Sequence, residues 1–231
     1  MRQIFIDTET TGLEPAEGHR VLELAAVEMV SRRVTGKVCH WRLNPEREVD
    51  EAAAKIHGMR WEDIKGEPKF AEVAEAFIAF ARDAEWIIHN APFDLGFLNA
   101  ELARANKPAC EKLYTNVVDT LALARSLYPG KSNSLDALCE RLNISNAHRV
   151  LHGACLDAQL LAEVYLALTR GQGSLKMAAA APTISLPAFG DSSTPLTVLA
   201  ANEEERAAHE AYLEQMKTKG GACLWAGFGK K

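Results

Sequence analysis

The chain has 231 residues, 48% of them hydrophobic and 25% charged, which is enough to bury one substantial core and form one domain with an appendage. Its formal net charge of -5 at pH 7 argues against an independent, tight nucleic-acid binder, because such proteins usually carry a basic surface. The sequence contains no signal-peptide pattern and no apolar run long enough to cross a bilayer, so we expect a cytoplasmic protein.

The N-terminal part of the sequence predicts an antiparallel meander of three strands. Three stretches rich in Val, Ile and Leu are separated by glycines or polar residues, as strands joined by short turns require. The predicted strands are Gln3–Asp7, Val21–Val30 and Val34–Leu43.

The middle of the chain predicts a helix, a buried strand and another helix in succession. Apolar residues within Val73–Ala81 recur at spacings of three or four, which is a helical period. Trp86–His89 is a short, continuous apolar run, typical of a central strand buried on both faces. The segment Asn90–Pro92 then opens a helix that carries Leu95, Leu98 and Leu102.

Three more helices are expected before residue 171. They are Thr120–Leu127, Leu135–Leu142 with the capping-type pair Asn133-Ser134 before it, and Leu156–Leu168, the strongest helical pattern in the sequence. An order of strands first, followed by mixed strands and helices, predicts an α/β sheet flanked by helices.

The C-terminal part differs in composition from the rest. From about Gly171 it is rich in Ala, Pro, Ser, Thr and Gly without sustained periodicity, which predicts a flexible linker over 172–202. A short amphipathic helix is expected from Glu203 to about Lys217, followed by an apolar tip with Leu224 and Trp225 that suggests a docking peptide. We therefore expect three parts, 1–171, 172–202 and 203–231.

The cysteines indicate neither a disulfide framework nor a zinc site. Their number is odd, they are widely spaced, and they include no C-x-x-C pair. We expect reduced, mostly buried thiols at Cys39, Cys110, Cys139, Cys155 and Cys223.

Asp7 and Glu9 are the first candidates for chemistry. They lie two residues apart at the end of a predicted strand, so both side chains project from one face of the sheet. Like charges this close are unfavourable unless a cation lies between them, which suggests a divalent metal with oxygen ligands. The alternative is a polar strand end before the turn Thr10–Gly12.

Three further residues are candidates for the same site. Asp94 lies in the first turn of a predicted helix after a buried strand, where either the helix dipole or a ligand accounts for a carboxylate. Asp157 lies on the apolar side of its helix, so it needs a metal or a cationic partner. His152, just before that helix, is suited to take a proton from water, although a loop histidine is often merely solvated.

Together, Asp7–Gly12, Asn90–Asp94 and His152-x4-Asp157 resemble the three motifs of the DEDDh superfamily of 3′→5′ exonucleases. More specifically, roughly Met1–Gly171 resembles the family of proofreading epsilon subunits of bacterial DNA polymerase III. The resemblance implies a ribonuclease H-like fold and two-metal hydrolysis of the 3′-terminal phosphodiester of DNA, which releases 5′-mononucleotides. The matching stretches also include Val34–Gly36, Ile56–Gly58, Pro129–Cys139 and Leu151–Ala154.

The resemblance also implies a role for each site residue. Asp7 would bridge two Mg²⁺ or Mn²⁺ ions, Glu9 and Asp157 would complete the ligands, and Asp94 would act directly or through water. His152 would be the general base. Contacts to the substrate would come from the metal-binding Asp7, Glu9 and Asp157 together with Thr10, Leu13 and His57, which would contact or wedge apart the frayed 3′ nucleotide. Many relatives carry a Glu at the position of Ala52, which puts a substrate contact from that position in doubt here.

The tail carries resemblances of its own. Gln172, Leu175 and Met177 match the anchors of a peptide that binds the beta sliding clamp, and Leu224 and Trp225 match the segment that docks on the polymerase alpha subunit. A small theta-like subunit is a further possible partner. Two alternatives stay open at this point: an RNA-trimming exonuclease of the same superfamily, and a non-catalytic adaptor between clamp and polymerase.

Overall fold

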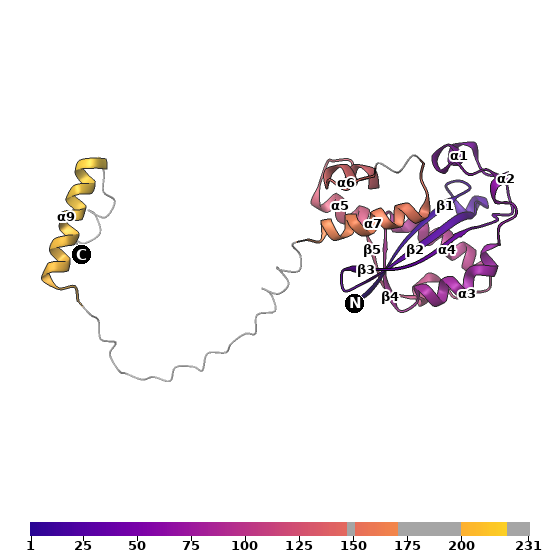
Figure 1. The fold of residues 1–231 in the computed structure, drawn as a ribbon, viewed down its shortest axis with the longest axis horizontal. Helices are drawn as coiled ribbons and strands as arrows, with labels where there is room; N and C mark the ends of the chain where they lie inside the picture. The colour runs from indigo at the N-terminus through magenta and orange to yellow at the C-terminus, as the bar shows by residue number, and fades with distance from the viewer. Residues whose placement is uncertain (147–150, 171–199, 221–231) are drawn as a thin grey trace, which may run out of the picture. The chain divides into compact units, whose positions relative to one another are not determined.

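The structure is a computed structural model that describes residues 1–146, 151–170 and 200–220 (Figure 1). The chain divides into two compact units, Met1–Ala180 and Ala181–Lys231. The first unit is built on a five-stranded mixed sheet with helices on both faces. The strands lie in the order β3-β2-β1-β4-β5.

The first three strands form the predicted meander. Each is antiparallel to the next along the chain, and each lies within one to three residues of its predicted bounds. The observed strands are β1 (Arg2–Thr10), β2 (Val21–Val30) and β3 (Arg33–Arg42).

The fourth strand, β4 (Ala84–Ile88), confirms the predicted buried strand. All five of its residues are buried, because helices cover both faces of the sheet here. It pairs in parallel with β1, and Ile6 lies opposite Ile88. Residues that follow Ile6 on β1 and Ile88 on β4 therefore meet at the same edge of the sheet, where α/β proteins usually bind ligands.

The helices pack on the sheet in two layers, one on each face, as predicted for an α/β sheet flanked by helices. Ile4 and Ile6 contribute to the core on one face, and Phe5 contributes to the core on the other. The first face is covered by α3 (Phe70–Ala81) and α4 (Ala91–Arg104). The second is covered by α5 (Thr120–Leu127), α6 (Leu135–Arg141) and α7 (Ala154–Leu168), and Ser134 caps α6 as predicted.

Several elements were not anticipated from the sequence. The edge strand β5 (Tyr114–Asp119) has no fully buried residue, so it lacks the apolar pattern that marks a strand. The helices α1 (Glu51–His57) and α2 (Trp61–Ile64) are too short to show a helical period. The described part of the unit also contains two short 3₁₀ helices, η1 (Pro15–Glu17) and η2 (Cys110–Lys112).

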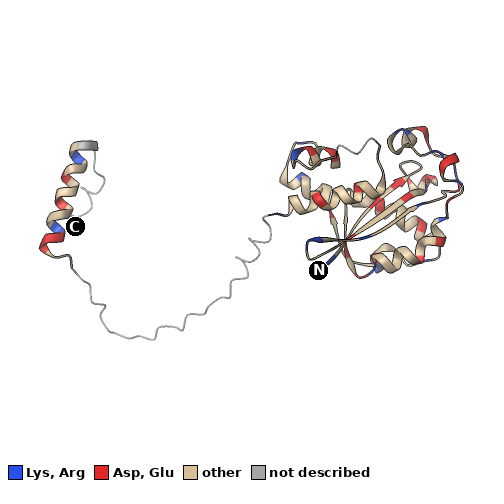
Figure 2. Cartoon of the chain, in the orientation of Figure 1, with Lys and Arg blue, Asp and Glu red and all other residues tan. Residues whose placement is uncertain are grey.

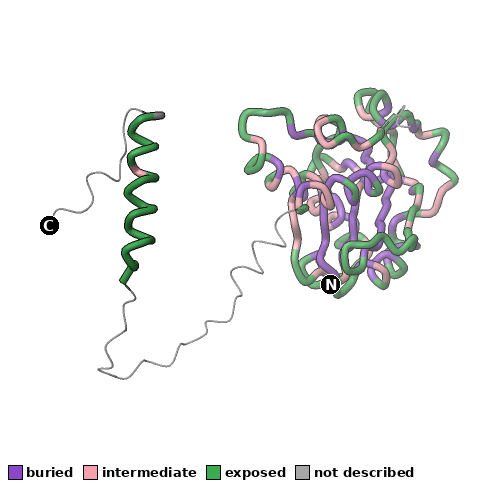
Figure 3. The backbone as a smooth tube through the Cα atoms, turned by 60° about the vertical axis from the view of Figure 1, so that its left-hand side comes forward, coloured by how far each residue is buried: buried purple, intermediate pink, exposed green. Residues whose placement is uncertain are grey.

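In the second unit the structure describes one helix, α9 (Glu203–Gly220). The predicted helix to about Lys217 is confirmed and continues to Gly220, with three glutamates in its first turn (Figure 2). Residues 203–218 are almost all exposed, unlike the central strands β1, β2 and β4 of the first unit (Figure 3). The predicted linker over 172–202, apart from its last residues, and the docking tip after Gly220 lie outside the described residues, so the clamp and polymerase anchors do too.

Four cysteines fall in the described part of the chain, and none of the four is in a disulfide bond. Cys110 and Cys139 are buried, whereas Cys39 and Cys155 are partly buried, as expected for reduced cysteines. Burial raises the pKa of the Cys110 thiol to about 12, so this residue stays protonated and unreactive. Among the described helices, none is long and apolar enough to cross a membrane.

Candidate active site

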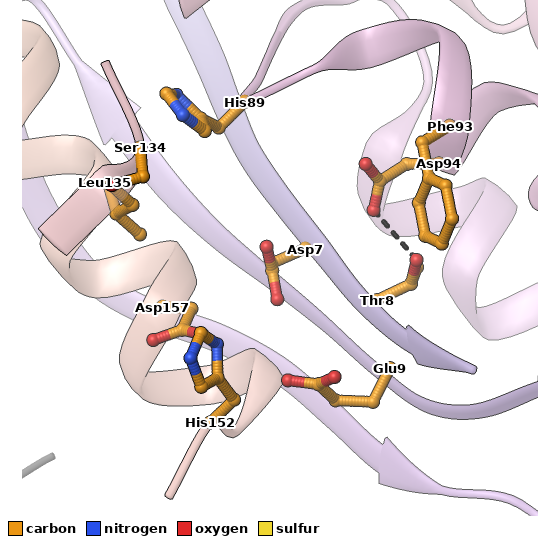
Figure 4. Close-up of a pocket in the computed structure, with 10 residues that line it drawn as sticks. All are labelled: Asp7, Thr8, Glu9, His89, Phe93, Asp94, Ser134, Leu135, His152 and Asp157. Carbon is orange, nitrogen blue, oxygen red and sulfur yellow. Dashed lines mark hydrogen bonds and ion pairs between the residues drawn. The ribbon is translucent and has the colours of Figure 1, made fainter. Parts of the chain in front are cut away.

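A cavity of about 280 Å³ opens at the carboxyl edge of β1 and β4. It brings together all five residues that the sequence singled out for chemistry, although they are spread over some 150 positions (Figure 4). The lining residues are Asp7, Thr8, Glu9, His89, Phe93, Asp94, Ser134, Leu135, His152 and Asp157.

Asp7 and Glu9 enter the cavity from β1. Both side chains project on the α7 side of the sheet, as the period of two predicts, and Thr8 between them projects toward α4 (Figure 4). The β1–β2 pairing is regular as far as Glu9, and its register shifts between Glu9 and Thr10. The two carboxylates are therefore held on regular strand geometry, which positions side chains more precisely than a loop does.

Asp94 reaches the cavity from the first turn of α4, on the other side of β1. It is buried, and Thr8 Oγ1 donates a hydrogen bond of 2.7 Å to its Oδ1. Burial raises the pKa of Asp94 to about 7, and the hydrogen bond from Thr8 opposes that rise. Because a nearby cation would offset this burial cost, the environment of Asp94 suits a metal site.

Asp157 and His152 come from α7 and the residues before it. Asp157 is only 3% exposed, which confirms that it faces the protein, and its Oδ2 lies 3.4 Å from His152 Nδ1. The His152 ring is partly exposed, while its backbone N–H donates to the carbonyl of Ile56 in α1 at 3.2 Å. Asp157 thus orients a histidine that is also open to solvent.

Three of the side chains form a cluster that could hold a metal ion. Glu9, His152 and Asp157 each offer one ligand atom, and these atoms all lie within 4.8 Å of one another. Carboxylate oxygens are typical ligands of hard divalent cations, and an imidazole nitrogen suits borderline ones. The sequence predicted His152 as a base only, so its place at ligand distance is a finding of the structure. Asp7 and Asp94 line the same cavity outside this cluster.

A second pocket, of about 330 Å³, adjoins the first and shares Thr8, Glu9 and Phe93 with it. Of the residues predicted to contact the substrate, the three that are not also predicted metal ligands line this pocket: Thr10, Leu13 and His57. Leu13 is 75% exposed at the rim, whereas His57 is buried, which lowers its pKa and favours a neutral ring. Ala52 also lines this pocket, so no carboxylate extends from that position.

Sequence reasoning missed several residues that line the first cavity. Thr8 and Phe93 were passed over because they are neutral neighbours of predicted ligands. His89 Nδ1 is 2.9 Å from Thr120 Oγ1, and burial lowers its pKa; its position at the end of a buried strand was an available signal. Ser134 and Leu135 were noted only as a helix start.

The fold and the cavity with its carboxylates define a nuclease, and residues 4–165 match the model of the family described as Exonuclease. DNA polymerase III subunit epsilon of Escherichia coli (strain K12) is 46% identical over 235 residues, which covers 97% of each chain. The chain therefore belongs to the exonuclease family and, within it, to the DNA polymerase III epsilon subunits. It is a 3′→5′ exonuclease of the proofreading type.

Solved structures of other exonucleases share this fold. Exonuclease X in complex with 5′ overhanging duplex DNA has a TM-score of 0.57 at 23% identity, over 74% of this chain and 93% of that one. The zinc-bound form of the E. coli ExoI–ssDNA complex has a TM-score of 0.66 at 20% identity, over 75% of this chain and 42% of that one. At this identity the likeness concerns the fold.

Proposed function

We propose that this exonuclease removes the 3′-terminal nucleotide of mismatched DNA as a 5′-mononucleotide, in the service of replicative DNA polymerase III, and that it depends on Mg²⁺ or Mn²⁺. The observation that carries the proposal is the convergence of four carboxylates and a histidine on one cavity, beside a largely apolar second pocket. The first pocket suits phosphodiester chemistry, and the second suits an unpaired base.

The residues present fit a pair of divalent cations. Asp7, Glu9 and Asp157 would hold the ions, and Asp7 lies between the other carboxylates of the cavity (Figure 4). Asp94, which accepts a hydrogen bond from Thr8, would act directly or through water. All four groups offer oxygen, which favours Mg²⁺ or Mn²⁺. When bound, the ions would lower the pKa of water and stabilise negative charge on the phosphate oxygens.

His152 is assigned the role of general base. Its ring is partly exposed, so it can accept a proton from the attacking water and release it to solvent. Asp157 lies 3.4 Å from the ring nitrogen Nδ1, so it orients the ring as well as serving as a ligand. The backbone bond from His152 to Ile56 keeps this residue near the second pocket.

The second pocket would receive the 3′-terminal nucleotide. Thr10 Oγ1 donates to the carbonyl of Gly12 at 2.7 Å, which holds the tight turn that presents Leu13 at the rim. An exposed leucine there can separate the last base from its neighbour, and His57 can contact it inside the pocket. Since opening a paired end costs a few kcal/mol and a mismatched end less, selectivity for mismatches needs no reading of the base.

The tail would supply the partners. The acidic chain lacks the charge to hold DNA alone, so we propose tethering: Leu224 and Trp225 dock on the polymerase alpha subunit, and Gln172, Leu175 and Met177 bind the beta clamp. A flexible segment over 172–202 would connect domain 1–171 to segment 203–231. Once segment 203–231 is docked, this tether would give the exonuclease domain a high effective concentration at the DNA end, so that the domain needs little affinity for DNA of its own. A theta-like subunit is a further candidate partner. We propose that the protein works in the cytoplasm.

Deleting the residues after Gly171 is expected to leave the hydrolysis rate on a short single-stranded DNA within about twofold, because all the lining residues of both pockets lie before that point. The same deletion should abolish co-elution with the alpha subunit in size-exclusion chromatography. A truncated protein that still co-elutes would place the docking surface in the exonuclease domain instead.

The proposed function is tested by digestion of a primer with a 3′ mismatch by the full chain, with Mg²⁺ or with EDTA. We expect mononucleotide release only with metal, and faster release from the mismatched end than from the paired one. Single-stranded RNA of the same sequence is the control, because an RNA-trimming enzyme would degrade it much faster than the DNA. That result, or no release at all, would contradict the proposal.

A further inference from the structure

The N-terminus of α7 is capped from outside its own segment. Its N-cap residue is Gly153, which has no side chain, and the first-turn N–H of Ala154 instead donates to Glu23 Oε2 at 2.9 Å. Glu23 lies on β2, 131 positions earlier in the chain. A negative charge at a helix N-terminus is favourable, and the bond ties the helix to the sheet.

The second oxygen of Glu23 is held as well. His40 Nε2 on β3 donates to Oε1 at 2.6 Å, so the carboxylate is fixed between a strand and a helix. Glu23 is only 4% exposed, and a buried carboxylate is tolerated because both its oxygens are hydrogen-bonded. Strand β2 lies between β3 and β1, and in its pairing with β1 Glu23 lies opposite Glu9.

We propose that Glu23, held by His40, is a positioning residue for the active site. It fixes the start of α7 to the strand next to the one that carries Glu9. The first turns of α7 carry Asp157, whose backbone N–H bonds to the Gly153 carbonyl, and His152 directly precedes Gly153. The distance between Glu9 and these two residues therefore depends on where α7 begins. The inference rests on the proposed function, in which these three groups act together.

A local cap would not achieve the same result. A serine at position 153 could satisfy the helix N–H groups, but it would tie α7 only to its own preceding loop. A carboxylate from β2 connects the helix to the sheet itself, which is more rigid than a loop. Its negative charge would also repel the neighbouring Glu9 if it were not compensated, and His40 and the helix N-terminus supply that compensation.

The test compares four variants of the full chain: Glu23→Ala, Glu23→Gln, His40→Ala and Glu28→Ala. Glu23→Ala removes both bonds, and Glu23→Gln keeps an oxygen for Ala154 and the size of the side chain. Glu28→Ala is the matched control, because Glu28 is also a buried glutamate of β2 but bonds Arg2 at 2.7 Å and Thr35 at 2.9 Å, away from the site. Measurements are the single-turnover rate with saturating Mg²⁺, Mn²⁺ binding by electron paramagnetic resonance, and the thermal midpoint.

We expect Glu23→Ala to lower the rate and weaken Mn²⁺ binding by roughly 10- to 100-fold each, the range for residues that orient metal ligands. Glu23→Gln should recover most of both losses. Glu28→Ala should lower the thermal midpoint and leave rate and Mn²⁺ binding near wild type. Amide exchange at Ala154 should be faster in Glu23→Ala and in His40→Ala, the latter serving if the former does not fold.

Three outcomes would overturn the inference: wild-type rate and Mn²⁺ binding in Glu23→Ala, equal losses in Glu28→Ala at a matched midpoint, or no recovery in Glu23→Gln. An inactive wild type that still binds Mn²⁺ would instead refute the proposed function, and with it the role of Glu23 in catalysis. The two failures are therefore distinguishable.

Discussion

Replacing Asp7 or Asp157 by Asn is expected to lower the single-turnover rate of DNA hydrolysis by about three to five orders of magnitude, while the domain stays folded. Each change removes one of the carboxylates that line the cavity, and metal ions contribute several kcal/mol of charge stabilisation to such reactions. Rapid-quench measurement with saturating Mg²⁺ checks the rate, and circular dichroism checks the fold.

The side chains allow a clear separation of catalysis from folding in these variants. Asn has nearly the shape of Asp, so neither change leaves a hole in the core. Asp63→Asn is a suitable control, because Asp63 bonds the backbone of Arg60 at the start of α2, outside both pockets. A rate within tenfold of wild type in Asp7→Asn would contradict the assigned mechanism.

Asp94→Asn is expected to stabilise the metal-free protein at pH 8 by roughly 2–4 kcal/mol and to reduce the hydrolysis rate strongly. Burial raises the pKa of Asp94 to about 7, so at pH 8 the folded state carries a buried negative charge that the unfolded state keeps in water. An asparagine can still accept the hydrogen bond from Thr8 without that charge.

The stability difference between Asp94→Asn and the wild type should depend on pH. Below the ordinary pKa near 3.8, Asp94 is protonated in both states and the variant has no advantage from charge. The advantage grows as the pH rises from there to about 7 and is complete above it. Urea unfolding with EDTA at pH 5 and pH 8 measures the difference, which should be larger at pH 8. With Mg²⁺ the wild type should be more stable than Asp94→Asn, because binding of the metal stabilises the folded wild type. Equal differences at both pH values would refute the explanation.

Much of the site was predictable because its signals are local. The spacing of Asp7 and Glu9 puts them on one face of any strand, and the apolar stripe of α7 turns Asp157 inward. The parallel pairing of β1 and β4 was not visible in the sequence, but the position of Asp94 after a buried run pointed to the same edge.

The features that could not be predicted from the sequence have no local sequence pattern. The edge strand β5 is half exposed and polar, so it forms because β4 offers it a hydrogen-bonding partner. The bond from Thr8 to Asp94 joins residues 86 positions apart, and the bond from Ala154 to Glu23 joins residues 131 apart. Glu23 itself reads as an ordinary polar residue of a strand.

The sequence by itself therefore determined the class of fold and, through three ordered motifs that resemble those of an exonuclease superfamily, the five candidate residues Asp7, Glu9, Asp94, His152 and Asp157. Strand and helix periods, which act over a few neighbouring positions, determined the face on which Asp7, Glu9 and Asp157 lie. Only the tertiary structure decided the distances between them: the 3.4 Å between His152 and Asp157, the cluster with Glu9, and the separate burial of Asp94 against Thr8. Those distances depend on where α4 and α7 begin relative to β1, and contacts between segments remote in the chain set that position.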